Sequence, residues 1–271
     1  MTITTHRISV GGVPQVYHVA GTGPICVAHS GGPGIDWAYL RMPLLERHFT
    51  MVYPEPVGTG DSGRLDGYDL AGYVEFVDAV VAALGVPRVF LLGHSHGGFV
   101  VQQYALDHPE RVAGLALYDT SPVTGPEFWD AAMAGVIAYG AVDPAIPAAF
   151  ERAVTATDDA VLSAALREAV PVYFADFPGR RAEFAQFVAG VRAWAVPQDA
   201  KPFDVRARLG EITVPTVIIV GEHDFICGPA WAAMLHAGIP GSRLVTLTSS
   251  GHFGHVEQPA EFAAAVTALL G

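Results

Sequence analysis

Cysteine is scarce in this sequence. The 271 residues include 2 cysteines, Cys26 and Cys227, which lie far apart in the chain and lack the spacing of metal ligands. This usage argues against a disulfide-stabilised scaffold and against a cysteine-rich zinc module. We therefore expect two free thiols and no metal site built on them.

Positive charge and long apolar segments are also scarce. The chain has 15 Lys and Arg against 27 Asp and Glu, and its formal net charge is −12 at pH 7. Nucleic-acid binding depends on clustered cations, and none occurs here, so we expect no nucleic-acid partner. No stretch approaches the ~18 apolar residues of a membrane span, and the first residues show no apolar export segment. We expect a cytoplasmic protein without a membrane partner; the sequence does not indicate its oligomeric state.

Apolar residues make up 51% of the chain, enough for one large core with a small appended unit. Between the later strand-like runs lie stretches with helical spacing, such as residues 69–84, which end before Gly85. This alternation predicts an α/β fold, with a mostly parallel eight-stranded sheet and helices on both faces. The strand-like runs are residues 3–10, 14–20, 25–29, 50–54, 88–93, 112–118, 215–221 and 243–248.

The rhythm changes between Pro122 and Leu209. This interval is rich in alanine, reads as short helices interrupted by prolines, and contains no convincing strand. The pattern predicts a helical cap at residues 122–209, inserted into an α/β core formed by residues 1–121 and 210–271.

Residues 93–97 read Gly-His-Ser-His-Gly and match the pattern G-x-S-x-G between an apolar strand and a helix. In such a turn the glycines leave room for a strained serine at the start of the helix, where free N–H groups favour negative charge. We therefore predict Ser95 as a nucleophile. His94 and His96 are its direct neighbours, so their side chains point away from its hydroxyl, and we expect both to pack or hydrogen-bond locally.

A serine hydroxyl needs a base to take its proton and an acid to orient that base. Asp224 and His252 each follow an apolar strand, and the carboxyl ends of parallel strands meet at one crevice. The order Ser95, Asp224, His252 therefore predicts a catalytic triad. Two alternatives stay open at this point: His255 as the base, and Asp119, which follows the strand at 112–118, as the acid.

Residues 28–34, Ala-His-Ser-Gly-Gly-Pro-Gly, follow the third strand-like run. Their glycines allow backbone N–H groups to approach a substrate oxygen and, together with the N–H of His96, predict an oxyanion hole. Neither a Lys-Ser/Thr pair nor a G-x-G-x-x-G pattern follows, which disfavours a phosphate cradle. We predict no cofactor and no metal.

Together these segments resemble the α/β-hydrolase superfamily and, within it, the proline iminopeptidase-like branch, whose hallmark is H-G-G-P-G after the third strand. The resemblance implies Ser95 as nucleophile, His252 as base and Asp224 as its orienter. It also implies the N–H groups of Gly32 and His96 as oxyanion donors, and a helical cap at the insertion. It covers nearly the whole chain and is carried by residues 30–34, 55–62, 93–97, 221–224 and 251–259.

The chain departs from that branch at three places. Ser30 stands where the branch has His, Glu55 where it has Asp, and the elbow reads GHSHGG where true iminopeptidases usually show GGSWGS. An aminopeptidase also needs cap carboxylates that hold the free amino group of its substrate, and no pair stands out. We expect a solvated acidic face from the six candidates Glu127, Asp130, Glu151, Glu168, Asp176 and Glu183.

The aromatic residues of the insertion are divided, in our interpretation, between cap core and an apolar substrate pocket. The sequence thus predicts a serine hydrolase that forms an acyl-enzyme at Ser95 with a small, hydrophobic ester, thioester or lactone. A proline iminopeptidase-type aminopeptidase is the first alternative. A non-catalytic ligand-binding protein of the same fold, and a lyase or cofactor-free oxygenase that uses the same triad, are alternatives of another class.

Overall fold

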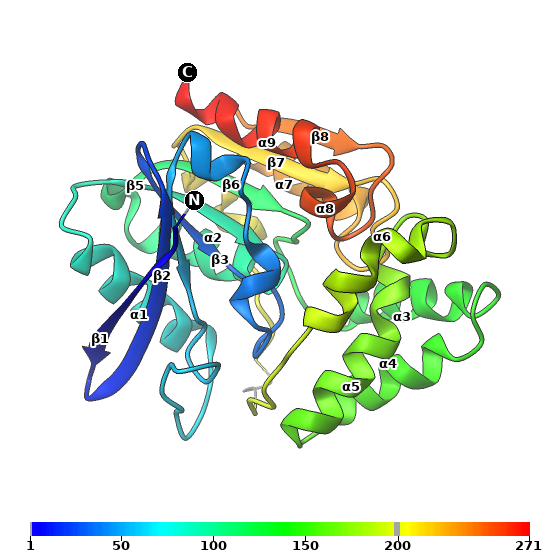
Figure 1. The fold of residues 1–271 in the computed structure, drawn as a ribbon. Coiled ribbons are helices and arrows are strands. Elements are labelled where there is room, and N and C mark those ends of the chain that lie inside the picture. The colour runs from blue at the N-terminus through cyan, green and yellow to red at the C-terminus, as the bar shows by residue number, and fades with distance from the viewer. Residues whose placement is uncertain (1, 198–200) are drawn as a thin grey trace.

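The computed structural model describes residues 2–197 and 201–271 (Figure 1). Eight strands form one sheet in the order β1-β2-β4-β3-β5-β6-β7-β8. β2 pairs antiparallel with β1 and β4, and the other neighbours pair in parallel, which confirms the predicted mostly parallel sheet. The strands are β1 Thr4–Val10, β2 Val13–Gly21, β3 Ile25–His29, β4 Thr50–Pro54, β5 Val89–His94, β6 Val112–Tyr118, β7 Thr216–Gly221 and β8 Arg243–Leu247.

Helices cover both faces of the sheet. One face packs against α1 (Leu70–Ala83), α2 (His96–Asp107) and α7 (Pro229–Gly238). The other face packs against α9 (Pro259–Thr267) and the 3₁₀-helices η1 (Trp37–Leu40) and η2 (Leu45–Arg47). The remaining short elements are α8 Gly254–Glu257, η3 Pro109–Arg111, η4 Val170–Tyr173, η5 Arg206–Glu211 and η6 Ala268–Leu270.

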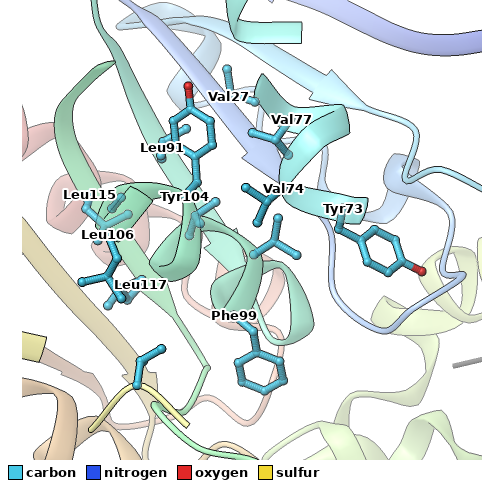
Figure 2. Close-up of a cluster of buried hydrophobic side chains, with 14 of the residues drawn as sticks. Val27, Tyr73, Val74, Val77, Leu91, Phe99, Tyr104, Leu106, Leu115 and Leu117 are labelled. Atoms are coloured by element: carbon cyan, nitrogen blue, oxygen red, sulfur yellow. The ribbon is translucent and has the colours of Figure 1, made fainter. Parts of the chain in front are cut away.

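Alternation along the central strands supplies both faces with apolar side chains. In β6, Leu115 and Leu117 join the core beneath α1 and α2, whereas Ala116 and Tyr118 join the core on the opposite face. Figure 2 shows the first of these cores, with side chains of the strands against those of α1 and α2. A strand buried on both sides reads as a continuous apolar run, which is why these strands could be predicted.

The predicted helix at 69–84 is α1. The carboxylate of Asp69 caps its N-terminus by accepting a hydrogen bond from the N–H of Gly72 at 2.8 Å. Gly85 follows its C-terminus with φ 68°, a left-handed conformation that glycine adopts without strain.

The interval between β6 and β7 holds α3 (Pro126–Tyr139), α4 (Ile146–Thr155), α5 (Asp159–Ala169) and α6 (Phe177–Gly190). These helices gather at one side of the sheet in Figure 1. A proline lies in the first turn of α3, α4 and α6, where its missing N–H leaves no hydrogen bond unmade.

The two ends of this interval meet in the structure. The N–H of Val205 donates to the carbonyl of Pro122 at 3.0 Å, and the N–H of Thr124 donates to that of Phe203 at 2.7 Å. The chain therefore leaves the sheet and returns to it at one place. The exact division into core and cap stays a prediction. No helix in the described part of the chain is both long and apolar enough to cross a membrane.

Candidate active site

Ser95 lies in the turn between β5 and α2, with φ 53° and ψ −120°. A positive φ is strained for a residue with a side chain, so the surroundings must hold it. The N–H of Ser95 donates to the carbonyl of Tyr118 at 3.0 Å. Its own carbonyl accepts from the N–H of Gly98 and from the hydroxyl of Thr120, both at 2.8 Å. The predicted turn is present, and hydrogen bonds to both its N–H and its carbonyl group hold Ser95 in place.

The two glycines of the elbow are required by close approach of the backbone. A Cβ on Gly93 would lie 2.4 Å from the carbonyl oxygen of Gly97. A Cβ on Gly97 would lie 2.3 Å from the carbonyl oxygen of His29 in β3. A side chain at position 93 would push α2 away from β5, and one at position 97 would push α2 away from β3, which is the physical reason for the G-x-S-x-G spacing.

Asp224 and His252, predicted as acid and base, are hydrogen-bonded to one another. Nδ1 of His252 lies 2.7 Å from Oδ2 of Asp224, and both side chains are buried. The other carboxylate oxygen accepts from the N–H groups of Ile226 at 2.9 Å and Cys227 at 3.1 Å. Because Nδ1 carries the proton of this bond, Nε2 of His252 is left as the proton acceptor.

Ser95 and His252 line the same cavity, and Cys227 is a close neighbour of Ser95. Burial raises the pKa of the Cys227 thiol well above its usual range, although the hydroxyl of Ser95 acts in the opposite direction. The sequence reading treated Cys227 only as a free thiol; its position three residues after Asp224 is the signal that placed it near the site.

His94 connects Tyr39 to the loop that carries His252. Its Nδ1 lies 2.6 Å from the hydroxyl of Tyr39, which accepts from the N–H of Gly31 at 2.6 Å, so Tyr39 donates to His94. Nε2 of His94 therefore donates to the carbonyl of His252 at 2.9 Å. Burial, reinforced by the nearby His252 and His255, lowers the pKa of His94 well below its usual range. His94 is thus a neutral connector, and Tyr39 is a site residue that the sequence reading missed.

His255, the alternative base, has both ring nitrogens engaged away from Asp224. Nδ1 lies 2.9 Å from the hydroxyl of Tyr118 and Nε2 lies 2.9 Å from the carbonyl of Tyr39. Burial lowers the pKa of His255 to about 4. This environment favours a neutral, structural imidazole.

The side chain of His96 packs edge-on against the rings of Tyr73 and Phe99. Its Nδ1 is buried without a hydrogen-bond partner among the described residues. Burial, with a smaller contribution from His29, lowers the pKa of His96 to about 3. Its ring is therefore neutral and has no contact with the carboxylate of Asp224.

The glycine-rich loop after β3 passes directly against the elbow. A Cβ on Gly31 would lie 2.8 Å from Cβ of Ser95, so only glycine fits there. The N–H of Gly31 is taken by Tyr39, and the next residue, Gly32, lines the cavity together with Ser95 and His96. Among the described residues, neither the N–H of Gly32 nor that of His96 has a hydrogen-bond acceptor, as oxyanion donors require.

A cavity of about 970 Å³ lies between the cap helices and the carboxyl edge of the sheet. Its wall is largely apolar. Phe174, Phe177 and Phe184 instead pack into a core within the cap, so the predicted division of the cap aromatics holds. The cap aromatics that line the cavity are Phe128, Trp129, Phe150, Tyr173, Phe187, Trp194 and Phe203.

A family model described as the α/β hydrolase fold matches residues 23–259. The chain belongs to the α/β-hydrolase fold family. One curated relative of this α/β hydrolase is the 2-hydroxy-6-oxo-2,4-heptadienoate hydrolase of Pseudomonas putida, 28% identical over 97% of this chain and 95% of the relative. The 2-hydroxymuconate semialdehyde hydrolase of Pseudomonas sp. strain CF600 is also 28% identical, over 97% and 93%.

The fold of this α/β hydrolase also matches solved structures. A hydrolase from Pseudomonas aeruginosa PA01 superposes with a TM-score of 0.75 and 27% sequence identity, over 98% of each chain. The superfamily resemblance and the fold class are thus confirmed, whereas membership of the proline iminopeptidase-like branch stays a prediction.

The six cap carboxylates considered for an aminopeptidase do not line the cavity of this α/β hydrolase. Three of them form exposed ion pairs: Glu127 with Arg206, Glu168 with Arg152, and Glu183 with Arg180. The carboxylates that do line the cavity are elsewhere, and both are engaged. Asp36 is paired with Arg192 at 2.6 Å, and Asp69 caps α1.

Two groups of side chains bring three metal-type donor atoms within 4.8 Å of one another: His94, Asp119 and His252, and Asp224, Cys227 and His252. In this α/β hydrolase both nitrogens of His94 and Nδ1 of His252 already make hydrogen bonds within the protein. The donor set therefore suits proton handling better than metal binding.

Proposed function

We propose that this chain is a cofactor-independent serine hydrolase with Ser95 as nucleophile, His252 as general base and Asp224 as the acid that orients the base. The observation that carries the proposal is the 2.7 Å hydrogen bond from His252 to Asp224, beside the cavity that the elbow serine also lines. The Asp224 carboxylate fixes the imidazole tautomer and stabilises the imidazolium formed during the reaction.

The reaction begins when the hydroxyl of Ser95, by rotation about the Cα–Cβ bond, approaches Nε2 of His252. As Nε2 takes the proton, Oγ bonds to the carbonyl carbon of the substrate, and the N–H groups of Gly32 and His96 hold the resulting oxyanion. His252 then returns the proton to the leaving oxygen or sulfur, which yields an acyl-enzyme. Water, activated by His252, attacks the acyl carbon and releases the acid and free Ser95.

The cavity supports a small, hydrophobic ester, thioester or lactone as the substrate class. Its volume of about 970 Å³ accommodates a compact organic molecule, and its aromatic wall favours an apolar acyl or leaving group. The names of both curated relatives describe hydrolysis of small oxo or semialdehyde compounds, in agreement with a carbonyl as the reacting group. An aminopeptidase is less well supported because the cap carboxylates point elsewhere.

Labelling with a fluorophosphonate probe tests the nucleophile. We expect the folded wild-type protein to be labelled at Ser95, and Ser95→Ala, matched by its circular dichroism, to stay unlabelled. A folded wild-type protein that resists labelling would overturn the hydrolase proposal. Turnover of p-nitrophenyl esters beside proline p-nitroanilide then tests the substrate class, and faster cleavage of the anilide would replace the esterase with an aminopeptidase.

A further inference from the structure

Asp119, the alternative acid, occupies a strained position next to the candidate triad. It directly follows β6 and has φ 42°, one of two positive φ values at non-glycine residues of the described chain. Two bonds to β7 hold it there: its N–H donates to the carbonyl of Ile219 at 2.9 Å, and its Oδ1 accepts from the N–H of Gly221 at 2.8 Å. The side chain is buried. Strain that is held in place so firmly at a site points to a role.

The second carboxyl oxygen of Asp119, Oδ2, is buried and has no hydrogen-bond donor among the described residues. If Asp119 were ionised, this oxygen would be a buried, unsatisfied acceptor. Asp224 is its neighbour: an oxygen of Asp119 and an oxygen of Asp224 each lie within 4.8 Å of a ring nitrogen of His252, and the two carboxyl groups act directly on one another. Two ionised carboxylates in contact repel one another, whereas one shared proton turns the contact into a hydrogen bond.

The donors around each acid decide which of them holds the proton. Asp224 accepts hydrogen bonds from Nδ1 of His252 and from two backbone N–H groups, all of which favour its ionised form. Among the described residues, Asp119 accepts a hydrogen bond from Gly221 alone. Burial and the charge of Asp224 raise the pKa of Asp119 well above its usual range. The proton therefore resides on Asp119.

We propose that Asp119 is a positioning residue that donates its carboxylic-acid O–H to Asp224 and so keeps the charge of Asp224 aimed at His252. This inference rests on the proposed function, because it assigns Asp224 as the orienting acid. Asp119 acts through Asp224 and does not contact the reacting atoms. At this edge of the sheet, Asp224 carries the negative charge and Asp119 donates a hydrogen bond to it.

Two substitutions test whether Asp119 acts as a hydrogen-bond donor or only fills space. Asp119→Asn keeps an N–H donor toward Asp224 and an oxygen for Gly221, and asparagine tolerates a positive φ. Asp119→Ala removes both. If the alanine variant does not fold because of the positive φ, Asp119→Gly, which adopts that conformation without strain, takes its place.

The measurements are kcat and KM on a p-nitrophenyl ester, together with the downfield proton NMR signal of the His252–Asp224 hydrogen bond. We expect Asp119→Asn to keep kcat within about fivefold and to keep the signal. Asp119→Ala should lower kcat about 10²-fold with KM nearly unchanged, because the misplaced acid no longer orients the base, and should shift or broaden the signal.

Two outcomes overturn the inference: an alanine variant as active as the wild type with an unchanged signal, or an asparagine variant as damaged as the alanine variant while both are folded. Fluorophosphonate labelling of the wild type distinguishes failure of the role of Asp119 from failure of the proposed function. If Ser95 is labelled and the variants still behave alike, only the role of Asp119 fails. If the folded wild type is not labelled, the proposed function itself fails.

Discussion

The sheet edge and the cap border the same cavity, but their side chains are held in different ways. At the sheet edge, Ser95 and Asp224 are fixed by backbone hydrogen bonds, and the backbone of His252 donates to the carbonyl of Tyr173 at 2.7 Å. In the cap, Phe128 and Phe187 are held by contacts between aromatic rings. Directional bonds fix atoms within fractions of an ångström, whereas ring contacts tolerate adjustment. We therefore expect the edge to determine the chemistry and the cap to determine the choice of substrate.

The largest effect expected at the edge comes from the nucleophile and the base. Ser95→Ala and His252→Ala should each lower kcat by on the order of 10⁴ to 10⁶, and the double variant should lose little more, because the triad acts as a unit. Steady-state kinetics on an ester measures this. His96→Ala is the matched control: it keeps the backbone N–H, so kcat should stay within about fivefold. A larger loss of kcat in His96→Ala than in His252→Ala would show that His252 is not the base.

The two acids give the next contrast. Asp224→Asn should lower kcat by on the order of 10⁴, because the amide fixes the wrong imidazole tautomer while Ser95 stays in place. Asp119→Asn should retain most of the turnover, since an amide N–H replaces the acid O–H as the donor. Comparison of kcat for the two variants, both checked by circular dichroism, decides the matter. The reverse order would make Asp119 the orienting acid.

The contrast between the two regions also explains what the sequence could predict. Strands buried on both faces leave apolar runs, and the elbow needs glycines at fixed spacing, so the sheet, Ser95, Asp224 and His252 could all be located from residue patterns. Tyr39 could not, and for Cys227 only its position close to Asp224 in the sequence could. Their roles depend on contacts between segments far apart in the chain, and a tyrosine or a buried cysteine is ordinary in any core.

The cap aromatics illustrate the same limit. Phe184 and Phe187 lie three positions apart in α6, yet Phe184 is fully buried in the cap core and Phe187 lines the cavity. Helical spacing places the two side chains beside one another on α6, but it does not say which of them borders the cavity. The cap residues that line the cavity could therefore be identified only from the structure.

Substitutions of Phe184 and Phe187 test whether the cap determines which substrate is bound. Phe187→Ala should raise KM about tenfold for an apolar ester with kcat within about threefold, because it removes binding that the ground state and the transition state share. Phe184→Ala is the control at the same helix: it should lower the free energy of unfolding by about 3 to 5 kcal/mol and change KM little in the folded fraction. A fall in kcat with unchanged KM in Phe187→Ala would place the cap in the chemistry.

Glu257 joins the two regions and gives the smallest and most specific prediction. One carboxylate oxygen accepts from the N–H of Ala175 in the cap at 2.9 Å, and the other accepts from the N–H of Gly251, beside His252, at 2.7 Å. Burial raises the pKa of Glu257 to about 7, although both N–H groups and the charge of Arg180 act in the opposite direction. Asp224 is close enough to add to the rise.

Because the folded protein binds this proton more tightly than the unfolded chain does, the stability that Glu257 contributes is complete at low pH and is lost as the pH rises toward about 7. Glu257→Gln does not titrate, and its amide nitrogen cannot accept one of the two backbone N–H bonds, which lowers its stability by the same amount at every pH. The free energy of unfolding of the wild type relative to that of the variant should therefore fall by on the order of 3 kcal/mol between acidic and alkaline pH, with kcat within about threefold. Urea unfolding of both proteins across this range measures the difference. If the wild type gains on the variant as the pH rises, the bonds to Ala175 and Gly251 stabilise the charged form more than burial opposes it, and the junction between edge and cap is an ionic one.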